Sequence, residues 1–146
     1  MGLGIISEQV FNFYNCYHSM LLTGKKIAAT QSTPEVILDP DGVITIRGKS
    51  MNKNATEFYN QVDSWIDTYI SNPADLTRVD IYMEYFNGSN SIIFNSLIRK
   101  ISAVKLKNKE FVINWYYEED DDDILAQGEN ISSILNIPVN LIMTEE

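Results

Sequence analysis

The chain is poor in cysteine, histidine and positive charge, with one Cys, one His and 11 Lys or Arg among 146 residues. The single cysteine, Cys16, excludes an internal disulfide and fits a reducing compartment, so we expect a cytoplasmic protein. A zinc site built from about four Cys or His ligands has no support for the same reason. The sequence therefore describes a protein without disulfides or a zinc centre.

The chain also lacks the features that carry a protein into a membrane. No apolar stretch approaches the roughly 20 residues that cross a bilayer. Lys25 and Lys26 come only after the first apolar segment, so the basic start of a secretory signal is missing. We predict no membrane insertion.

The charge balance is acidic, with a net charge of −9. Proteins that bind nucleic acid neutralise phosphates with clustered Lys and Arg, and here these residues are scattered. The same shortage disfavours an anionic membrane surface. An acidic chain of this size is better suited to a protein partner with a basic patch.

The chain divides into residues 1–25 and 26–146. In the first part Ser7 can cap a helix whose apolar residues follow helical spacing as far as Gly24. These residues are Val10, Phe13, Tyr14, Tyr17, Met20 and Leu21. We interpret residues 1–25 as an appended helical segment and residues 26–146 as one domain with its own core.

The second part alternates strand and helix patterns. Five strands are predicted, at Glu35–Asp39, Val43–Arg47, Val79–Phe86, Phe111–Tyr117 and Val139–Met143. Apolar stripes predict three helices. The first begins after Asn54, the second contains Ile93–Val104 and the third contains Ile124–Leu135. Pro40-Asp41-Gly42 predicts a tight hairpin between the first two strands. The order predicts an α/β fold: a single small sandwich with a mixed sheet of about five strands and about three flanking helices.

The carboxyl ends of parallel strands are where open α/β sheets place their sites, and the loop Asn87–Ser91 lies there. It follows the predicted third strand and opens the second helix. Backbone N–H groups and the helix dipole would therefore favour a negative group at this loop. The alternative is that Asn, Gly and Ser only form a turn and a helix cap.

The acidic run Glu118–Asp123 ends the next strand at the same edge of the sheet. It is open to three interpretations: a solvated loop that favours the start of a helix, a docking surface for a basic partner, or a divalent-cation site. We rank the metal site last, because contiguous carboxylates rarely converge on one ion. If the two strands are neighbours, a phosphate on the loop would be repelled by the run. We predict a partner-binding surface made of Asn87, Gly88, Ser89, Asn90, Glu118, Glu119, Asp120 and Asp121.

No nucleophilic catalyst is evident in the sequence. His18 and Cys16 lie close together, but no third group is evident to orient them as a catalytic pair. Strand alternation places Trp115 and Tyr117 on one face and Tyr116 on the other, so the three cannot form one aromatic box. We predict a protein that is not an enzyme and that needs no cofactor or metal.

Several segments in the same order and spacing resemble the SiaC family of regulatory phosphoproteins. They are Thr33-Pro34-Glu35-Val36, Asn54-Ala55, Glu57-Phe58-Tyr59 and Tyr85-Phe86-Asn87. The most specific is Asn114–Asp121, which reads NWYYEEDD. The resemblance runs from about Lys26 to the C-terminus and leaves the first 24 residues outside.

The resemblance implies a fold similar to anti-sigma-factor antagonists (STAS-like domains) and no catalytic activity. In such proteins a kinase phosphorylates a threonine in an Asn-Thr-Ser-Ser loop, and a metal-dependent Ser/Thr phosphatase removes the phosphate. The best-known member binds and activates a diguanylate cyclase when unphosphorylated. The resemblance thus implies control of cyclic di-GMP and biofilm formation.

This chain departs from the family pattern at Gly88, where the family has its threonine. The phosphorylation candidates that remain are Ser89, which we favour, and Ser91. One alternative is a constitutive, unphosphorylated binding module, which the missing threonine favours. A second alternative is an acidic metal-binding protein or enzyme built on the acidic run.

Overall fold

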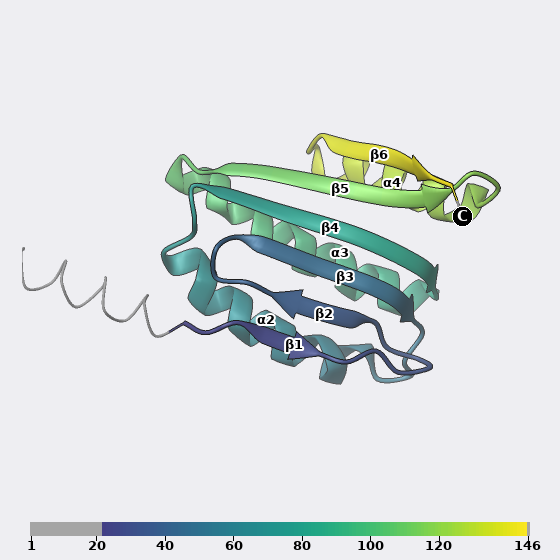
Figure 1. The fold of residues 1–146 in the computed structure, drawn as a ribbon, viewed down its shortest axis with the longest axis horizontal. Helices are drawn as coiled ribbons and strands as arrows, with labels where there is room; N and C mark the ends of the chain where they lie inside the picture. The colour runs from purple at the N-terminus through teal and green to yellow at the C-terminus, as the bar shows by residue number, and fades with distance from the viewer. Residues whose placement is uncertain (1–21, 146) are drawn as a thin grey trace, which may run out of the picture.

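The computed structural model describes residues 22–145, which form one mixed sheet with helices against it (Figure 1). The strands are β1 (Lys25–Ile27), β2 (Glu35–Leu38), β3 (Val43–Ser50), β4 (Leu76–Phe86), β5 (Glu110–Glu118) and β6 (Val139–Thr144). The helices are α2 (Ala55–Ser71), α3 (Gly88–Ile101), the 3₁₀ helix η1 (Ser102–Lys107) and α4 (Asp122–Leu135).

The strands lie in the sheet in the order in which they follow along the chain. β1, β2 and β3 pair antiparallel, whereas β3 to β6 pair in parallel. Right-handed crossovers that always advance in one direction place every connecting helix on the same face. Figure 1 shows α2, α3 and α4 together behind the sheet. The other face carries no helix from residues 22–145.

Local signals in the sequence account for the turns and helix ends. The tight hairpin between β2 and β3 is closed by a hydrogen bond from Asp39 N to Val43 O of 3.0 Å, and Gly42 supplies a φ of 108°. Only glycine adopts this φ readily. At the start of α2, the Asn54 side chain accepts a hydrogen bond from Glu57 N at 3.2 Å and donates to the Glu57 carboxylate at 2.8 Å. The Asn54 side chain therefore caps α2.

The core lies between the helices and the covered face of the sheet. Its fully buried members from the strands include Ile44, Ile46, Val79, Ile81, Ile113 and Trp115, and those from the helices include Val62, Ile66, Phe94 and Ile98. The Trp115 indole donates a hydrogen bond to Ile124 O at 2.8 Å, which satisfies its buried N–H. Among the helices of residues 22–145, none has the length and apolarity required to span a bilayer.

The predicted α/β class, the mixed sheet and the three helices are confirmed. The predicted strand count was one short, because β1 has only three residues and starts with two exposed lysines. Lys25, which we assigned to the appended segment, belongs to this strand. The predicted N-terminal helix and its boundary residues before Leu22 lie outside the described residues. The likeness to STAS domains stays a prediction.

Candidate functional site: the carboxyl-end rim of the sheet

The segment Asn87–Ser91 is the cap and first turn of α3 rather than a separate loop. The Asn87 side-chain oxygen accepts a hydrogen bond from Asn90 N at 3.1 Å, and Asn87 O accepts one from Ser91 N at 3.0 Å. The apolar pattern from Ile93 onward did not reveal this earlier start. The two phosphorylation candidates therefore lie on a helix.

Asn90 ties this turn to the core. Its side chain is 1% exposed, accepts a hydrogen bond from Ser50 Oγ at 2.9 Å and donates one to Asn52 O at 2.9 Å. Because the Ser50 hydroxyl proton is used on Asn90, the Tyr59 hydroxyl donates to Ser50 Oγ at 2.7 Å. We predicted Asn90 as a partner contact, but the structure places its side chain inside, where it positions the turn.

The buried end of this network keeps Tyr59 neutral. Burial raises the pKa of the Tyr59 hydroxyl to about 12. Tyr59 lies on α2, whereas Ser50 ends β3. The first turn of α3 is thus bonded, through neutral groups, to the neighbouring strand and helix.

Three positions of the turn differ in how they meet solvent. Gly88 and Ser89 are both exposed, and a Cβ placed on Gly88 would meet no atom within 4 Å. The Ser91 hydroxyl is occupied, because it donates a hydrogen bond to Gly88 O at 2.8 Å. Within residues 22–145 the Ser89 hydroxyl has no such partner. Ser89 is therefore the more accessible of the two predicted phosphoacceptors.

The acidic run lies at the start of α4. Asp121 caps this helix by accepting a hydrogen bond from Ile124 N at 3.0 Å, and Asp122 and Asp123 occupy its first turn. Carboxylates are favourable there because they meet the positive end of the helix dipole. This confirms the interpretation that the last acids support a helix. Glu118, Glu119 and Asp120 remain exposed around the preceding turn.

The two segments share one rim because β4 and β5 are adjacent and parallel. A hollow of about 650 Å³ lies between the end of β4, at Tyr85 and Phe86, and the start of α4, at Asp121 and Asp123. Within residues 22–145 no hydrogen bond or ion pair joins Asn87–Ser91 to the acidic run. The two segments therefore lie at the same edge of the sheet, with open space between them.

The side chains of residues 22–145 do not form any group of three or more His, Cys, Asp or Glu that could hold a metal ion. The acidic run is extended over a turn and a helix start, so its carboxylates do not converge. His18 and Cys16 lie outside the described residues. The described part of the chain therefore offers no support to the metal-site alternative.

The family can be read from the chain itself. A model of the SiaC family of regulatory phosphoproteins matches residues 27–144, which extend from the end of β1 to the end of β6. The chain belongs to the SiaC family. An uncharacterized relative from Pseudomonas aeruginosa (strain UCBPP-PA14) is 20% identical over 113 residues, which cover 77% of this chain and 90% of that protein.

Solved structures of SiaC from Pseudomonas aeruginosa have the same fold. The SiaC chain in the crystal structure of the diguanylate cyclase SiaD with its activator SiaC matches with a TM-score of 0.75 and 19% identity, over 82% of this chain and 99% of that one. The crystal structure of apo-SiaC matches with a TM-score of 0.73 and 20% identity, over 82% and 98%. The six-stranded sheet is thus a SiaC fold.

We did not predict from the sequence of this SiaC-family chain that polar and aromatic side chains lie together on the helix-free face of the sheet. Along β4 the residues Arg78, Asp80, Tyr82 and Glu84 alternate with buried apolar ones. A parallel strand covered on both faces would read as a continuous apolar run. The alternation was therefore a signal, available in the sequence, that one face of the sheet lacks helices.

Proposed function

We propose that this chain is a non-enzymatic signalling protein that binds a partner protein under control of phosphorylation at Ser89. The observation that carries the proposal is the exposed Ser89 hydroxyl in the first turn of α3, held on the core through Asn90. A phosphate on Ser89 would face solvent and the positive end of the helix dipole. It would change the charge of the rim without disturbing the buried network.

The partner that we propose is a diguanylate cyclase, so that the output is cyclic di-GMP and biofilm formation. This rests on family membership and on the SiaC of Pseudomonas aeruginosa, which is described as the activator of the cyclase SiaD. A protein kinase and a metal-dependent phosphatase would set the phosphorylation state. The surface would consist of Asn87, Gly88 and Ser89 with Glu118, Glu119, Asp120 and Asp121.

Phosphate mapping tests the switch directly. The protein is isolated from its own cells, and the tryptic peptide of residues 79–99, which holds both Ser89 and Ser91, is examined by mass spectrometry. We expect phosphate on Ser89. Phosphate on Ser91 alone would place the phosphorylation site half a helical turn further along α3. An unmodified peptide under all growth conditions would show that this chain is not controlled by phosphorylation here.

A pull-down then asks whether the phosphate matters. The bait is the wild-type chain, Ser89→Asp or Ser89→Asn, and the prey is the diguanylate cyclase of the same cells. We expect Ser89→Asp to recover less cyclase than Ser89→Asn, which has the same size and no charge. Equal recovery would contradict control at this position.

One observation favours a constitutive binding module as the second candidate. Gly88 stands where the family pattern has threonine, and the space around it is open, so no steric reason excludes a side chain there. Gly88→Thr should restore a solvent-facing hydroxyl. If the kinase of these cells phosphorylates Gly88→Thr but not the wild type, this chain has lost the switch and binds constitutively.

A further inference from the structure

The helix-free face of the sheet carries a stacked row of three side chains that the proposed switch does not use. The rings of Tyr82 on β4 and Tyr116 on β5 are 4.1 Å apart and nearly parallel, at 9°. The Arg47 guanidinium of β3 lies 4.4 Å from the centre of the Tyr82 ring. Because β4 lies between β3 and β5, Arg47 and Tyr116 cover opposite faces of Tyr82. The row therefore consists of the Arg47 guanidinium, the Tyr82 ring and the Tyr116 ring, in this order.

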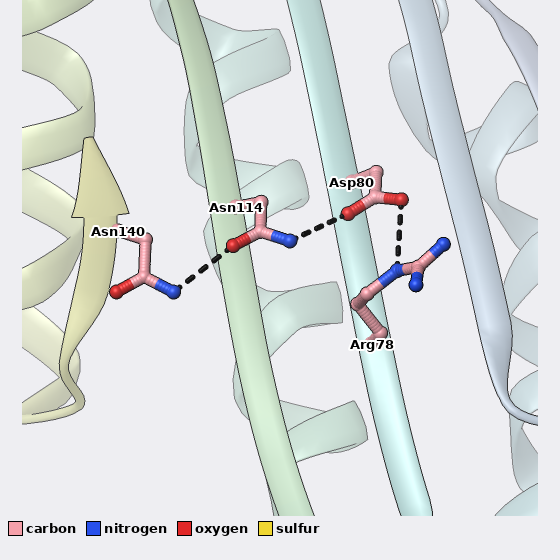
Figure 2. A network of polar contacts seen from close by, with 4 residues as sticks. All are labelled: Arg78, Asp80, Asn114 and Asn140. Atoms are coloured by element: carbon pink, nitrogen blue, oxygen red, sulfur yellow. Dashed lines mark hydrogen bonds and ion pairs between the residues drawn. The ribbon is translucent and has the colours of Figure 1, made fainter. Parts of the chain in front are cut away.

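A second row of polar side chains lies on the same face of the sheet, two residues earlier than the stack along β4 and β5. Asp80 is 7% exposed and accepts hydrogen bonds from Arg78 Nε at 3.0 Å and from Asn114 Nδ2 at 2.9 Å. Asn140 Nδ2 donates to Asn114 Oδ1 at 3.0 Å, so the network crosses β4, β5 and β6 (Figure 2). Side chains held in this way lose little freedom when a partner binds. This row of the face is therefore held in place before a partner binds.

The charge beside the stack is unbalanced. A hollow of about 530 Å³ opens over Tyr82 and Tyr116, and its wall carries the carboxylates of Glu84, Glu118 and Asp121. Arg47 is the single cation in this wall, and it is engaged on Tyr82. Within residues 22–145 no lysine or arginine forms an ion pair with these three carboxylates. The hollow therefore has a surplus of negative charge.

On the side of β6 the next side chain in this row is apolar and half-buried. Tyr116 lies opposite Ile142 in the register of β5 and β6. Among the described residues, no cation lies over the Tyr116 ring, whereas Tyr82 carries Arg47. Aromatic faces next to carboxylates are a favourable environment for a guanidinium or ammonium group.

Charge decides which occupant fits. A second copy of this chain would bring a net charge of −9 against the same carboxylates. Residues 1–21 contain no lysine or arginine, so this segment cannot supply a guanidinium or a lysine ammonium group. A segment of another protein that carries arginine or lysine complements both the acids and the ring.

We propose that the helix-free face over β3 to β6 is a second docking surface, which shares Glu118 with the proposed rim surface and binds an arginine- or lysine-bearing segment of a partner protein. The cationic side chain enters the hollow beside Tyr116 and is held there by Glu118 and Glu84. Tyrosine and arginine are residues on which binding energy concentrates at protein interfaces.

A peptide titration followed by NMR tests this surface. The probe is an alanine-based helical peptide with arginine at every fourth position, and its control has citrulline, which is uncharged and of equal size, in place of arginine. We expect the arginine peptide to shift the backbone amides of Tyr116 and Glu118 and the side-chain amides of Asn114 and Asn140. The citrulline peptide should leave them in place.

Matched variants locate the binding. Glu118→Gln should weaken the arginine peptide about threefold to fivefold, and Tyr116→Leu should do so by a similar factor. Glu119→Gln removes the same charge one residue away, outside the hollow, and should leave the affinity within about 1.5-fold. Equal losses from Glu118→Gln and Glu119→Gln would overturn the proposal, as would an arginine peptide that shifts none of the sheet signals.

The outcome is independent of the switch. The amide of Ser89 lies in the first turn of α3, at the rim, and should not shift with the peptide. A chain that is never phosphorylated at Ser89 would still give the expected peptide result. A chain that is phosphorylated but fails the titration would keep the switch and lose the second surface.

Discussion

The starts of α3 and α4 stand next to each other at the rim and differ in charge. Both helices follow adjacent parallel strands, and each is capped by a side-chain oxygen, from Asn87 or from Asp121. The first turn of α4 contains Asp122 and Asp123, whereas that of α3 contains no acidic residue. The positive end of the α4 dipole is therefore already matched by carboxylates. The positive end of the α3 dipole has no carboxylate in its first turn, which favours reversible addition of a phosphate there.

The two starts also differ in how they are fixed to the core. α3 is bonded through Asn90 to Ser50 and Asn52. α4 is held mainly by close packing, because the Trp115 ring lies directly under Gly128, and by one hydrogen bond from the Trp115 indole to Ile124 O. Hydrogen bonds fix the position of a helix start through their direction. Close packing fixes it through the space that neighbouring side chains fill. The predictions below separate these two ways of anchoring.

Removal of the polar anchor should give the largest effect. Asn90→Ala leaves the buried Ser50 hydroxyl proton without its acceptor and the half-buried Asn52 carbonyl without its donor, which should lower the free energy of unfolding by about 3 kcal/mol. Asp121→Ala removes a half-buried cap from α4 and should cost about 1 kcal/mol. Urea unfolding measures both. Equal losses would mean that the network does not anchor α3 more strongly than a simple cap.

The packed anchor of α4 can be tested with a matched pair of glycines. A Cβ on Gly128 would lie 2.6 Å from Trp115 Cδ1, and this ring is fully buried, so Gly128→Ala should cost about 2 kcal/mol. Gly88→Ala in α3 meets open space and should be neutral or stabilise by up to about 1 kcal/mol. Thermal unfolding of both variants compares them. A destabilised Gly88→Ala would show that the α3 turn has less room than the structure gives it.

The sequence predicted what local chemistry determines. The turn at Pro40-Asp41-Gly42 and the start of a helix after Asn54 each depend on residues within four positions, and both were found. Asn90 was predicted as a surface residue because its partners Ser50 and Asn52 lie 40 and 38 positions away. Such contacts follow from strand order, which the sequence alone does not display.

The same reason hid the helix-free face of the sheet. Tyr82 and Tyr116 are 34 positions apart, and only the pairing of β4 with β5 brings their rings together. The alternation along β5 correctly placed Tyr116 and Trp115 on opposite faces of the sheet. It does not predict which strand pairs with β5. β1 was missed for a simpler reason, since three residues are too few to show a pattern.

Alkaline pH should weaken the α3 anchor through Tyr59. Its pKa is raised to about 12 in the folded chain and is near 10 in an unfolded one, so unfolding releases a proton between these values. The resulting stability is present in full below pH 10 and is lost as pH rises toward 12. The slope should reach about 1.4 kcal/mol per pH unit more than in Tyr59→Phe. Parallel slopes for wild type and Tyr59→Phe in urea unfolding between pH 9.5 and 11.5 would contradict this.

A negative charge at the start of α3 should give the smallest effect and the one closest to function. Ser89→Asp places a carboxylate in the first turn, where the dipole is not yet matched, and should raise the free energy of unfolding by about 0.5 kcal/mol over Ser89→Asn. Because the site is exposed, about 0.5 M salt should remove most of this gain. A destabilised Ser89→Asp would mean that repulsion from the acidic run across the rim exceeds the dipole attraction. In that case a phosphate would disturb α3 itself, and control of the partner would act through the helix rather than through surface charge alone.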